Sequence, residues 1–337
     1  MYDRADSRPF KMGAMSLSVL FLSICLLDFT AGAFLPLTPR TSINHVKAIR
    51  NPLFPGFYAD PEIRIYEETF WIFPTTSIAF EDQTYFDAFS SPDLVTWTKH
   101  ANIFTATGWA RDNFWAPTSW KGRDGKYYFY FSANGLRSQH DDAGLGVLVA
   151  DRPEGPYKDA LGQRLISTLV NGGNPMDPDI LQDTYGTLYF YFGGTTTNVA
   201  ILDPSMLAFR TLPDNTTFKN ITPSSTYVEG VKVFQRQGIY YMMWSENGYG
   251  DPTYQVAYGM SRSPLGPFPR EAAVLQQRPG LAVATGHNSV VQVPGTDEWW
   301  VVYHRRPANE TDANSRVIAM DRLFFNEDGT IQQVMIT

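Results

Sequence analysis

Five short hydrophobic runs rich in aromatic residues recur along the chain at intervals of about 50 to 60 residues. Clusters of Gly, Pro, Asp and Asn separate them, and no segment between them carries a sustained helical period. Runs of this kind are typical of β-strands, and a period of this length is typical of β-propeller blades. The runs are Phe70-Trp71-Ile72-Phe73 and residues 127–131, 188–192, 240–244 and 299–303.

An acidic residue, a tryptophan or a histidine precedes each hydrophobic run by about ten to twelve positions. Since repeats that hold phase put equivalent positions at equivalent places, we expect these five side chains at one end of a central axis. The pattern predicts an all-β, five-bladed β-propeller over residues 51–337. The alternative, a β-sandwich, leaves the shared phase unexplained. The five residues are Asp60, Trp115, Asp177, Glu229 and His287.

A second phrase also recurs, and it places an aromatic residue just after a turn. Residues 150–157 end in Tyr157, residues 260–268 end in Phe268, and residues 90–97 form a related version. We expect this phrase in the outer part of a blade, where the aromatic side chain fills the gap to the next blade.

The first 33 residues have the pattern of a secretory signal peptide. Basic residues precede a short apolar run at 16–27, and small residues follow it at 31–33. A signal anchor that stays attached is the alternative. Residues 34–50 lack periodicity and are expected to form a linker or N-terminal strap. The single cysteine, Cys25, lies inside the signal, so the mature chain would have no disulfide bond.

Secretion would expose three Asn-X-Thr sequons to glycosylation, at Asn215, Asn220 and Asn309. We therefore expect an extracellular glycoprotein with no membrane association once the signal is cleaved. The chain has 27 Lys and Arg against 34 Asp and Glu, a net charge of −7. Nucleic acid is an unsuitable partner for such a chain because phosphate binding needs a basic surface.

Three of the in-phase residues are carboxylic acids: Asp60, Asp177 and Glu229. An Asp followed by Pro is often only a turn signal, and a single Glu beside Gly is usually a surface residue. Three carboxyl groups in one phase are a different matter, because each raises the pKa of the others unless its surroundings differ. Glycoside hydrolysis needs one protonated and one ionised carboxyl group at the same pH, so the pattern favours this reaction.

The remaining in-phase residues suit sugar binding, although each also has a structural explanation. Trp115 would serve equally as core or as a platform for a sugar ring, and His287 as a buried histidine with satisfied hydrogen bonds or as a ligand to water or a cation. Arg305, Arg306 and Arg316 follow the fifth run. Spacing does not choose among these arginines, and we take Arg316 as the candidate that binds substrate.

Together these motifs resemble glycoside hydrolase family 43, in order and over essentially all of residues 51–337. The resemblance implies a five-bladed propeller that hydrolyses arabinosides, xylosides and some galactosides with inversion. It implies Asp60 as the general base, Glu229 as the general acid and Asp177 as the residue that orients the acid and tunes its pKa. Asp179 is an alternative to Asp177. The motifs are Tyr58-Ala59-Asp60-Pro61, Trp115-Ala116-Pro117, Met176-Asp177-Pro178, Glu229-Gly230 and Gly286-His287-Asn288-Ser289.

The resemblance also bears on cofactors and substrate. It implies no required cofactor, with an axial Ca²⁺ or other cation near His287 as a further expectation. Val231 stands where the family usually has proline. We expect a secreted, exo-acting α-L-arabinofuranosidase that acts on plant cell-wall polysaccharide or oligosaccharide. β-Xylosidase and galactofuranosidase or galactosidase activities are alternatives, and a sugar-binding propeller without catalysis is the alternative from another class.

Overall fold

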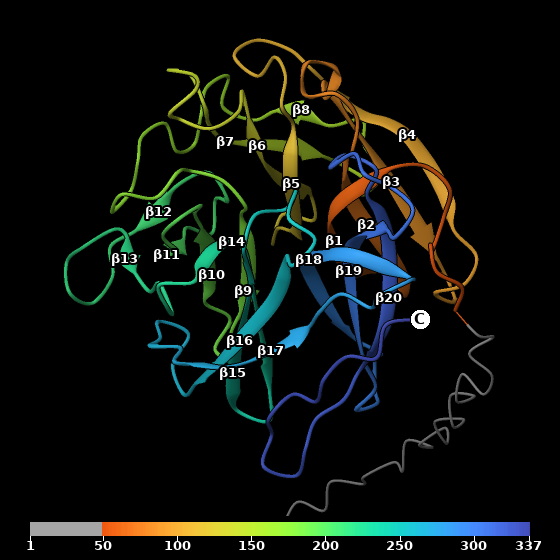
Figure 1. Cartoon of the computed structure of the whole chain (residues 1–337). Coiled ribbons are helices and arrows are strands. Elements are labelled where there is room, and N and C mark those ends of the chain that lie inside the picture. Colours follow the sequence, from red (N-terminus) through yellow and green to blue (C-terminus); the bar gives the residue numbers. More distant parts are fainter. Residues whose placement is uncertain (1–48) are drawn as a thin grey trace, which may run out of the picture. The chain divides into compact units, whose positions relative to one another are not determined.

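The computed structural model describes residues 49–337, which form five antiparallel sheets around a central axis (Figure 1). This arrangement confirms the predicted all-β, five-bladed propeller. The first two sheets contain β1 (Tyr58–Tyr66), β2 (Thr69–Thr76), β3 (Tyr85–Ser91) and β4 (Thr98–Thr105), then β5 (Trp115–Lys121), β6 (Tyr127–Ala133), β7 (Gly144–Ala150) and β8 (Lys158–Asp159). The third contains β9 (Asp179–Gln182), β10 (Leu188–Phe192), β11 (Asn198–Leu202), β12 (Phe209–Arg210) and β13 (Lys219–Asn220). The last two contain β14 (Tyr227–Arg236), β15 (Ile239–Glu246), β16 (Gln255–Ser261) and β17 (Arg270–Leu275), then β18 (Ala282–Gln292), β19 (Trp299–Pro307) and β20 (Val317–Leu323).

The five hydrophobic runs lie on the second strands of the blades: β2, β6, β10, β15 and β19. These strands are hydrophobic on both faces because each blade is covered on both sides by its neighbours. On β6, Phe129 packs 5.6 Å from Phe73 of the first blade, and Tyr130 packs 5.2 Å from Phe190 of the third. Five buried hydrophobic clusters fill the five spaces between consecutive blades. Hydrophobic burial between blades is therefore the main force that closes the ring.

The aromatic residues of the second repeated phrase fill gaps between blades, as expected. Tyr157 follows β7 and packs among buried residues of the first two blades. Phe268 follows β16 and packs with residues of the third and fourth blades.

The ring is closed by the residues just before β1, which lie against the last strand. The backbone N–H of Leu53 donates to the carbonyl of Ile318 on β20, and Asn51 exchanges side-chain hydrogen bonds with the backbone of Met320. The first and last blades are thus held together by hydrogen bonds as well as by hydrophobic packing. The predicted signal peptide and all but the end of the predicted strap lie outside the described residues.

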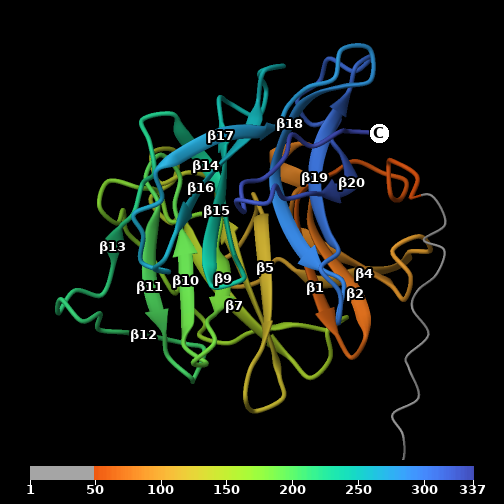
Figure 2. The ribbon, with the colours of Figure 1, turned by 90° about the horizontal axis from the view of Figure 1, so that it is seen from below.

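The innermost strands β1, β5, β9, β14 and β18 contact one another in a closed ring around the axis, and Figure 2 shows them from a direction at right angles to Figure 1. A residue in the left-handed backbone region stands within four of these strands and just before β9, and in those four it lies beside a β-bulge. Such a conformation is costly for residues other than glycine, and it is often retained at functional sites. The five residues are Asp60, Ala116, Asp177, Gly230 and His287, with φ from 43° to 70°.

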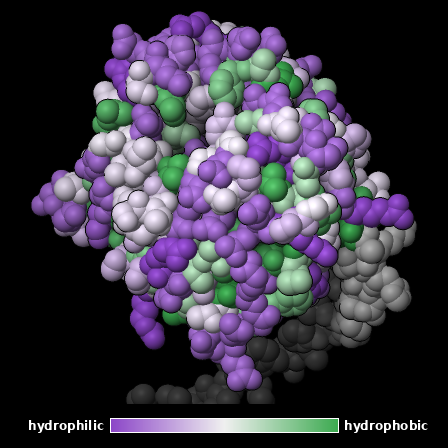
Figure 3. Space-filling view, viewed as in Figure 1, coloured by the Kyte–Doolittle hydropathy of each residue, from purple (hydrophilic) through white to green (hydrophobic). Residues whose placement is uncertain are grey.

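The exterior is predominantly hydrophilic on the face shown in Figure 3, where hydrophobic residues are scattered in small groups. The asparagines of the three sequons are all exposed, and their glycosylation stays a prediction. Among residues 49–337, no helix has the length and hydropathy needed to cross a membrane.

Candidate active site

All six predicted site residues line one cavity of about 170 Å³ near the N-terminal ends of the innermost strands. A larger cavity of about 740 Å³ lies at the opposite ends of β1, β5 and β9, and it contains none of the six. We place the active site in the smaller cavity because only there do carboxyl groups of different blades converge. Its lining is Asp60, Phe80, Trp115, Leu136, Gln139, Met176, Asp177, Glu229, Tyr249, His287 and Arg316.

Asp60 is surrounded by cationic and imidazole groups from the fifth blade and the segments beside it. Its Oδ1 lies 3.3 Å from the Arg316 guanidinium, 3.1 Å from Nδ1 of His304 and 3.4 Å from Nδ1 of His287. Burial alone would raise the pKa of Asp60, but Arg316 and the two histidines outweigh it and hold this pKa well below its usual range. These surroundings therefore favour the ionised form of Asp60.

Glu229 stands in contrasting surroundings on β14. Its Oε1 accepts a 2.7 Å hydrogen bond from the hydroxyl of Tyr254. Burial raises the pKa of Glu229, and the lowering effects of His287 and of this hydrogen bond do not cancel the rise. A carboxyl group whose pKa is raised, beside one whose pKa is lowered, is the combination that acid–base cleavage of a glycosidic bond requires.

Asp177 carries the third carboxyl group of the cavity. Its Oδ2 accepts a 2.9 Å hydrogen bond from the backbone N–H of Gly230, the residue after Glu229. Its own backbone N–H donates to Ser132 Oγ. Burial, together with the negative charges of Glu229 and Asp60, raises the pKa of Asp177 to about 7. Asp177 is thus placed to fix the backbone beside Glu229 and to share proton binding with that carboxyl group, because the two repel when both are ionised.

Asp179, the alternative considered from the sequence, takes a different position. Its carboxylate binds Lys232 Nζ over 2.8 Å and the backbone N–H of Val233 over 2.8 Å. It is not part of the cavity lining. The geometry therefore favours Asp177 for the role beside the acid.

Trp115 forms part of one wall of the cavity together with Phe80. Its Nε1 donates to Gln83 Oε1 over 2.5 Å, and the ring of Phe80 packs edge-on against it at 5.6 Å. Phe80 and Gln83 belong to the 3-10 helix η1 (Phe80–Asp82) and its C-cap. Trp115 is only partly buried, so it offers an aromatic surface to a sugar ring.

Among the three arginines, only Arg316 reaches the carboxylates. Its Nε donates to Ser77 Oγ over 2.9 Å, and its guanidinium lies 4.9 Å from the ring of Tyr249. Arg305 instead donates to the backbone of Thr337, and Arg306 to that of Gly250. Arg316 is thus the one of the three that lies beside a cavity carboxylate, and its role in substrate binding stays a prediction.

The surroundings of His287 are a poor fit for Ca²⁺. This ion prefers six to eight oxygen ligands, and the carboxylate nearest His287 is that of Asp60, which Arg316 already pairs. Among the described residues, no group of three or more His, Cys, Asp or Glu side chains is arranged to hold a metal.

Several site residues were missed by sequence reasoning. Tyr254 and Tyr249 stand before β16, His304 is on β19, and Phe80 lies between β2 and β3, so none shares the phase of the innermost strands. Tyr254 can approach the axis because Gly286 has no side chain: a Cβ there would lie 1.9 Å from the tyrosine ring. The Gly286-His287 pair was the one sequence signal for this contact.

The whole propeller matches a known family. The model of glycosyl hydrolases family 43 matches residues 49–331. The β-D-galactofuranosidase xynD of Aspergillus niger is 40% identical over 314 residues, which cover 88% of each chain. An arabinoxylan arabinofuranohydrolase of Paenibacillus polymyxa is 28% identical and covers 94% of this chain and 56% of its own.

Solved structures agree with this match. An α-L-arabinofuranosidase from Clostridium thermocellum superposes with a TM-score of 0.67 at 27% identity, covering 83% of this chain and 94% of its own. A thermostable family-43 glycoside hydrolase gives a TM-score of 0.73 at 24% identity, covering 86% and 96%, and this likeness speaks for the fold alone. Because the family model spans nearly the whole described propeller and a relative at 40% identity spans most of the chain, the protein belongs to glycosyl hydrolases family 43 and is a glycoside hydrolase.

Proposed function

We propose that this chain is an inverting, exo-acting furanosidase in which Asp60 is the general base and Glu229 the general acid. The observation that carries the proposal is the pair of opposed pKa shifts in one cavity. Arg316 and two histidines hold Asp60 ionised, while burial favours the proton on Glu229. Asp60 would accept a proton from the attacking water, and Glu229 would donate one to the leaving oxygen.

The cavity size supports exo action on one terminal sugar. Its volume of about 170 Å³ is below the roughly 300–1,000 Å³ of pockets for drug-sized ligands. Such a cavity suits a single monosaccharide unit, with Trp115 and Phe80 beside the ring.

We propose a terminal β-D-galactofuranosyl residue as the first substrate candidate and a terminal α-L-arabinofuranosyl residue as the second. The A. niger relative at 40% identity supports the first, and the arabinofuranohydrolase and arabinofuranosidase relatives support the second. The two sugars share their ring configuration and differ in the exocyclic group, so one cavity could accept both. The relatives thus reorder the candidates, because sequence reasoning put arabinofuranosyl first. β-Xylosyl hydrolysis has no comparable support at this identity.

The substrate proposal is tested with 4-nitrophenyl β-D-galactofuranoside, α-L-arabinofuranoside and β-D-xyloside as substrates. We expect the highest kcat/KM on one of the two furanosides and at least about a hundredfold lower activity in Asp60→Asn. Sugar binding by calorimetry without release from any substrate would instead make the chain a binding propeller. Preference for the xyloside would exclude the furanosidase proposal while leaving the glycosidase assignment intact.

We also propose that the protein is secreted, glycosylated and active on plant cell-wall polysaccharide or its oligosaccharides. The N-terminal pattern, the exposed sequons and the activities named for the relatives support this. Expression in a fungal host tests it: the medium should contain a chain that begins near residue 34 and loses mass on treatment with an N-glycosidase.

A further inference from the structure

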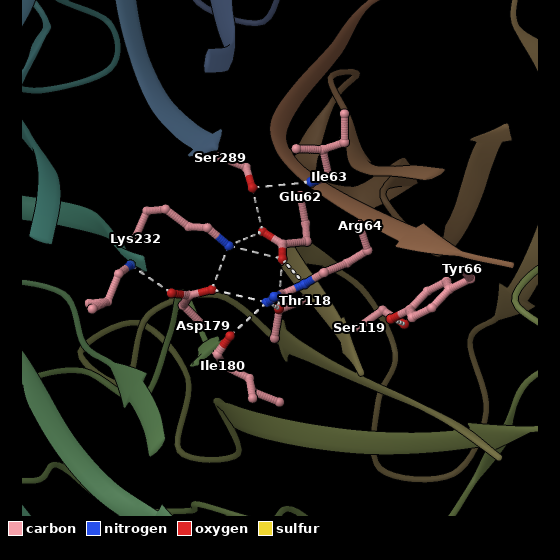
Figure 4. A network of polar contacts seen from close by, with 11 residues as sticks. Glu62, Ile63, Arg64, Tyr66, Thr118, Ser119, Asp179, Ile180, Lys232 and Ser289 are labelled. Carbon is pink, nitrogen blue, oxygen red and sulfur yellow. Dashed lines mark hydrogen bonds and ion pairs between the residues drawn. The ribbon is translucent and has the colours of Figure 1, made fainter. Parts of the chain in front are cut away.

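Two residues beyond each left-handed residue, every innermost strand carries a polar side chain. These five side chains come from five different blades, and their contacts converge on Glu62, which accepts hydrogen bonds from three of the other four (Figure 4). None of them belongs to the cavity lining of the active site. The five residues are Glu62, Thr118, Asp179, Lys232 and Ser289.

Lys232 binds both carboxylates of this cluster. Its Nζ lies 3.1 and 3.0 Å from the two carboxylate oxygens of Glu62 and 2.8 Å from Oδ1 of Asp179. Its side chain is only 4% exposed, and those of Glu62 and Asp179 are 6% and 2% exposed. A buried ammonium with two carboxylate partners is fully satisfied in charge and in hydrogen bonding.

Arg64, which lies on β1 like Glu62, supplies the second positive charge that balances the two carboxylates. It pairs with Glu62 and, over 3.2 Å, with Asp179, and it donates to the carbonyl of Ile180 over 2.9 Å. Glu62 also accepts a hydrogen bond of 2.8 Å from Ser289 and one of 3.3 Å from Thr118. Two cations and two anions leave the cluster neutral overall.

These contacts join strands that backbone hydrogen bonds do not join. β1, β9 and β14 belong to three different sheets, so no ladder fixes one against another. Glu62 stands two residues after Asp60, Asp179 two after Asp177, and Lys232 three after Glu229. One ammonium therefore links the three backbone segments that carry the three carboxyl groups of the active site.

We propose that Lys232 is a positioning residue of this active site: its ammonium is a built-in axial cation that holds β1, β9 and β14 together so that Asp60, Asp177 and Glu229 converge. The proposal rests on the roles assigned to these three residues under the proposed function. A buried ion pair does not by itself add stability, and its better-supported use is to fix one arrangement among several. Misplacing reacting groups by about 1 Å can cost about a hundredfold in rate, so such a link matters for catalysis.

The test compares Lys232→Met with Lys232→Met/Glu62→Gln, in which the cluster is neutral again but the link is absent. Arg236→Met is the control, because Arg236 lies on the same strand and pairs with Asp297 at the exposed end. Circular dichroism and thermal unfolding establish that each variant is folded. Steady-state kinetics are measured over pH on whichever glycoside the wild type cleaves, so a failure of the proposed substrate appears in the wild type and not in the comparison.

We expect Lys232→Met to lower kcat by at least about tenfold with a much smaller change in KM, since transition-state geometry is lost and binding is not. The net negative charge left in the cluster should also raise the pKa of the alkaline limb. The double variant should return that limb to its wild-type position while kcat stays low. Lys232 binds Glu62 from β1 and Asp179 from β9, and these two carboxylates also bind Arg64 from β1, Thr118 from β5 and Ser289 from β18. The groups that act on Glu229 are Tyr254, His287, Asp60, Asp177 and Arg316.

A folded Lys232→Met with wild-type kcat and pH profile would overturn the proposal, as would equal losses in Arg236→Met. If Lys232→Met does not fold, Glu62→Gln replaces it. That variant leaves the cluster with a net positive charge, so its alkaline limb must move to lower pH. An unmoved limb together with an unchanged kcat would then overturn the proposal.

Discussion

The backbone N–H of Gly230 donates a 2.9 Å hydrogen bond to Oδ2 of Asp177. This contact joins the third blade to the fourth at the residue directly after the proposed acid, Glu229. Gly230 has a φ of 70°, a conformation that glycine adopts at no steric cost. The bond therefore fixes a bulged backbone where the direction of the preceding side chain matters most.

Asp177→Asn should move the alkaline limb of the activity profile to lower pH. Asp177 and Glu229 titrate as an interacting pair, and their repulsion raises the pH at which the second proton of the pair is lost. Replacing Asp177 by a neutral amide removes this repulsion, so Glu229 loses its proton at lower pH. The amide oxygen can still accept the bond from Gly230, so the fold should survive. A kcat profile over pH measures the shift. Asp203→Asn, at a partly exposed position of the same blade, is the control. An unmoved limb in Asp177→Asn would limit Asp177 to a structural role.

Glu229→Gln and Asp60→Asn should respond differently to the leaving group. Each should lower turnover of natural glycans by about 10²–10⁴-fold, because general acid and base catalysis contribute that much. Glu229→Gln should recover activity on aryl glycosides with acidic phenols, which leave without a proton. Asp60→Asn should not recover, since the water still needs its base. Equal residual rates of both variants across a phenol series would contradict the assigned roles.

Sequence alone predicted the fold because the repeated hydrophobic runs and their turns are local signals. The positions of Asp60, Asp177 and His287 followed from phase, since all three occupy the left-handed position of their strands. Glu229 stands one residue earlier, and Gly230 occupies the equivalent position. Glu229 nevertheless lines the cavity, because β14 has a β-bulge on each side of it. Such a bulge leaves no periodic signal in the sequence.

Contacts between different blades were beyond the reach of sequence reasoning. Tyr254 and His304 reach the carboxyl groups from outside the phase, and only the packed structure brings them there. The polar residues at Glu62, Asp179 and Lys232 do share a phase, so the axial cluster had a signal. Phase alone does not show that these side chains contact one another, because the contacts run between blades.

Tyr254→Phe should move the alkaline limb to higher pH by a modest amount. The tyrosine hydroxyl stabilises the ionised form of Glu229 by donating a hydrogen bond, so its loss favours the proton. The ring that packs against Gly286 and 5.6 Å from His304 is retained, so stability should change little. The measurement is again kcat over pH, with Tyr249→Phe as the matched control. A shift to lower pH would show that Tyr254 instead supports the protonated acid.

The first sugar released should have the anomeric configuration opposite to that of the substrate. Asp60 and Glu229 come from the first and fourth blades, as expected for two carboxyl groups separated by roughly 6.5–9.5 Å with a water between them. Proton NMR during the first minutes of hydrolysis distinguishes the two anomers before mutarotation. Retention of configuration would require a covalent intermediate and would remove Asp60 from the role of base.

Arg316→Met should move the acidic limb of the profile to higher pH. Arg316 is the main group that offsets the effect of burial on Asp60, so its loss raises the pKa of the proposed base.

The stability of Arg316→Met should fall at neutral pH by roughly 3–5 kcal/mol, because a buried carboxylate loses its partner. The folded-state pKa of Asp60 is depressed in the wild type and higher in the variant, while the unfolded chains are alike at this residue. As pH falls the variant takes up a proton at Asp60 first, and the wild-type advantage shrinks from that pH downward. Thermal unfolding from pH 7 to pH 3 should therefore show the two proteins converging in acid. Arg305→Met is the control, because Arg305 contacts no carboxylate of the site; it should lower stability without moving the acidic limb. A matching shift of the limb in both variants would show that positive charge in general, and not the Arg316 contact, sets the pKa of Asp60.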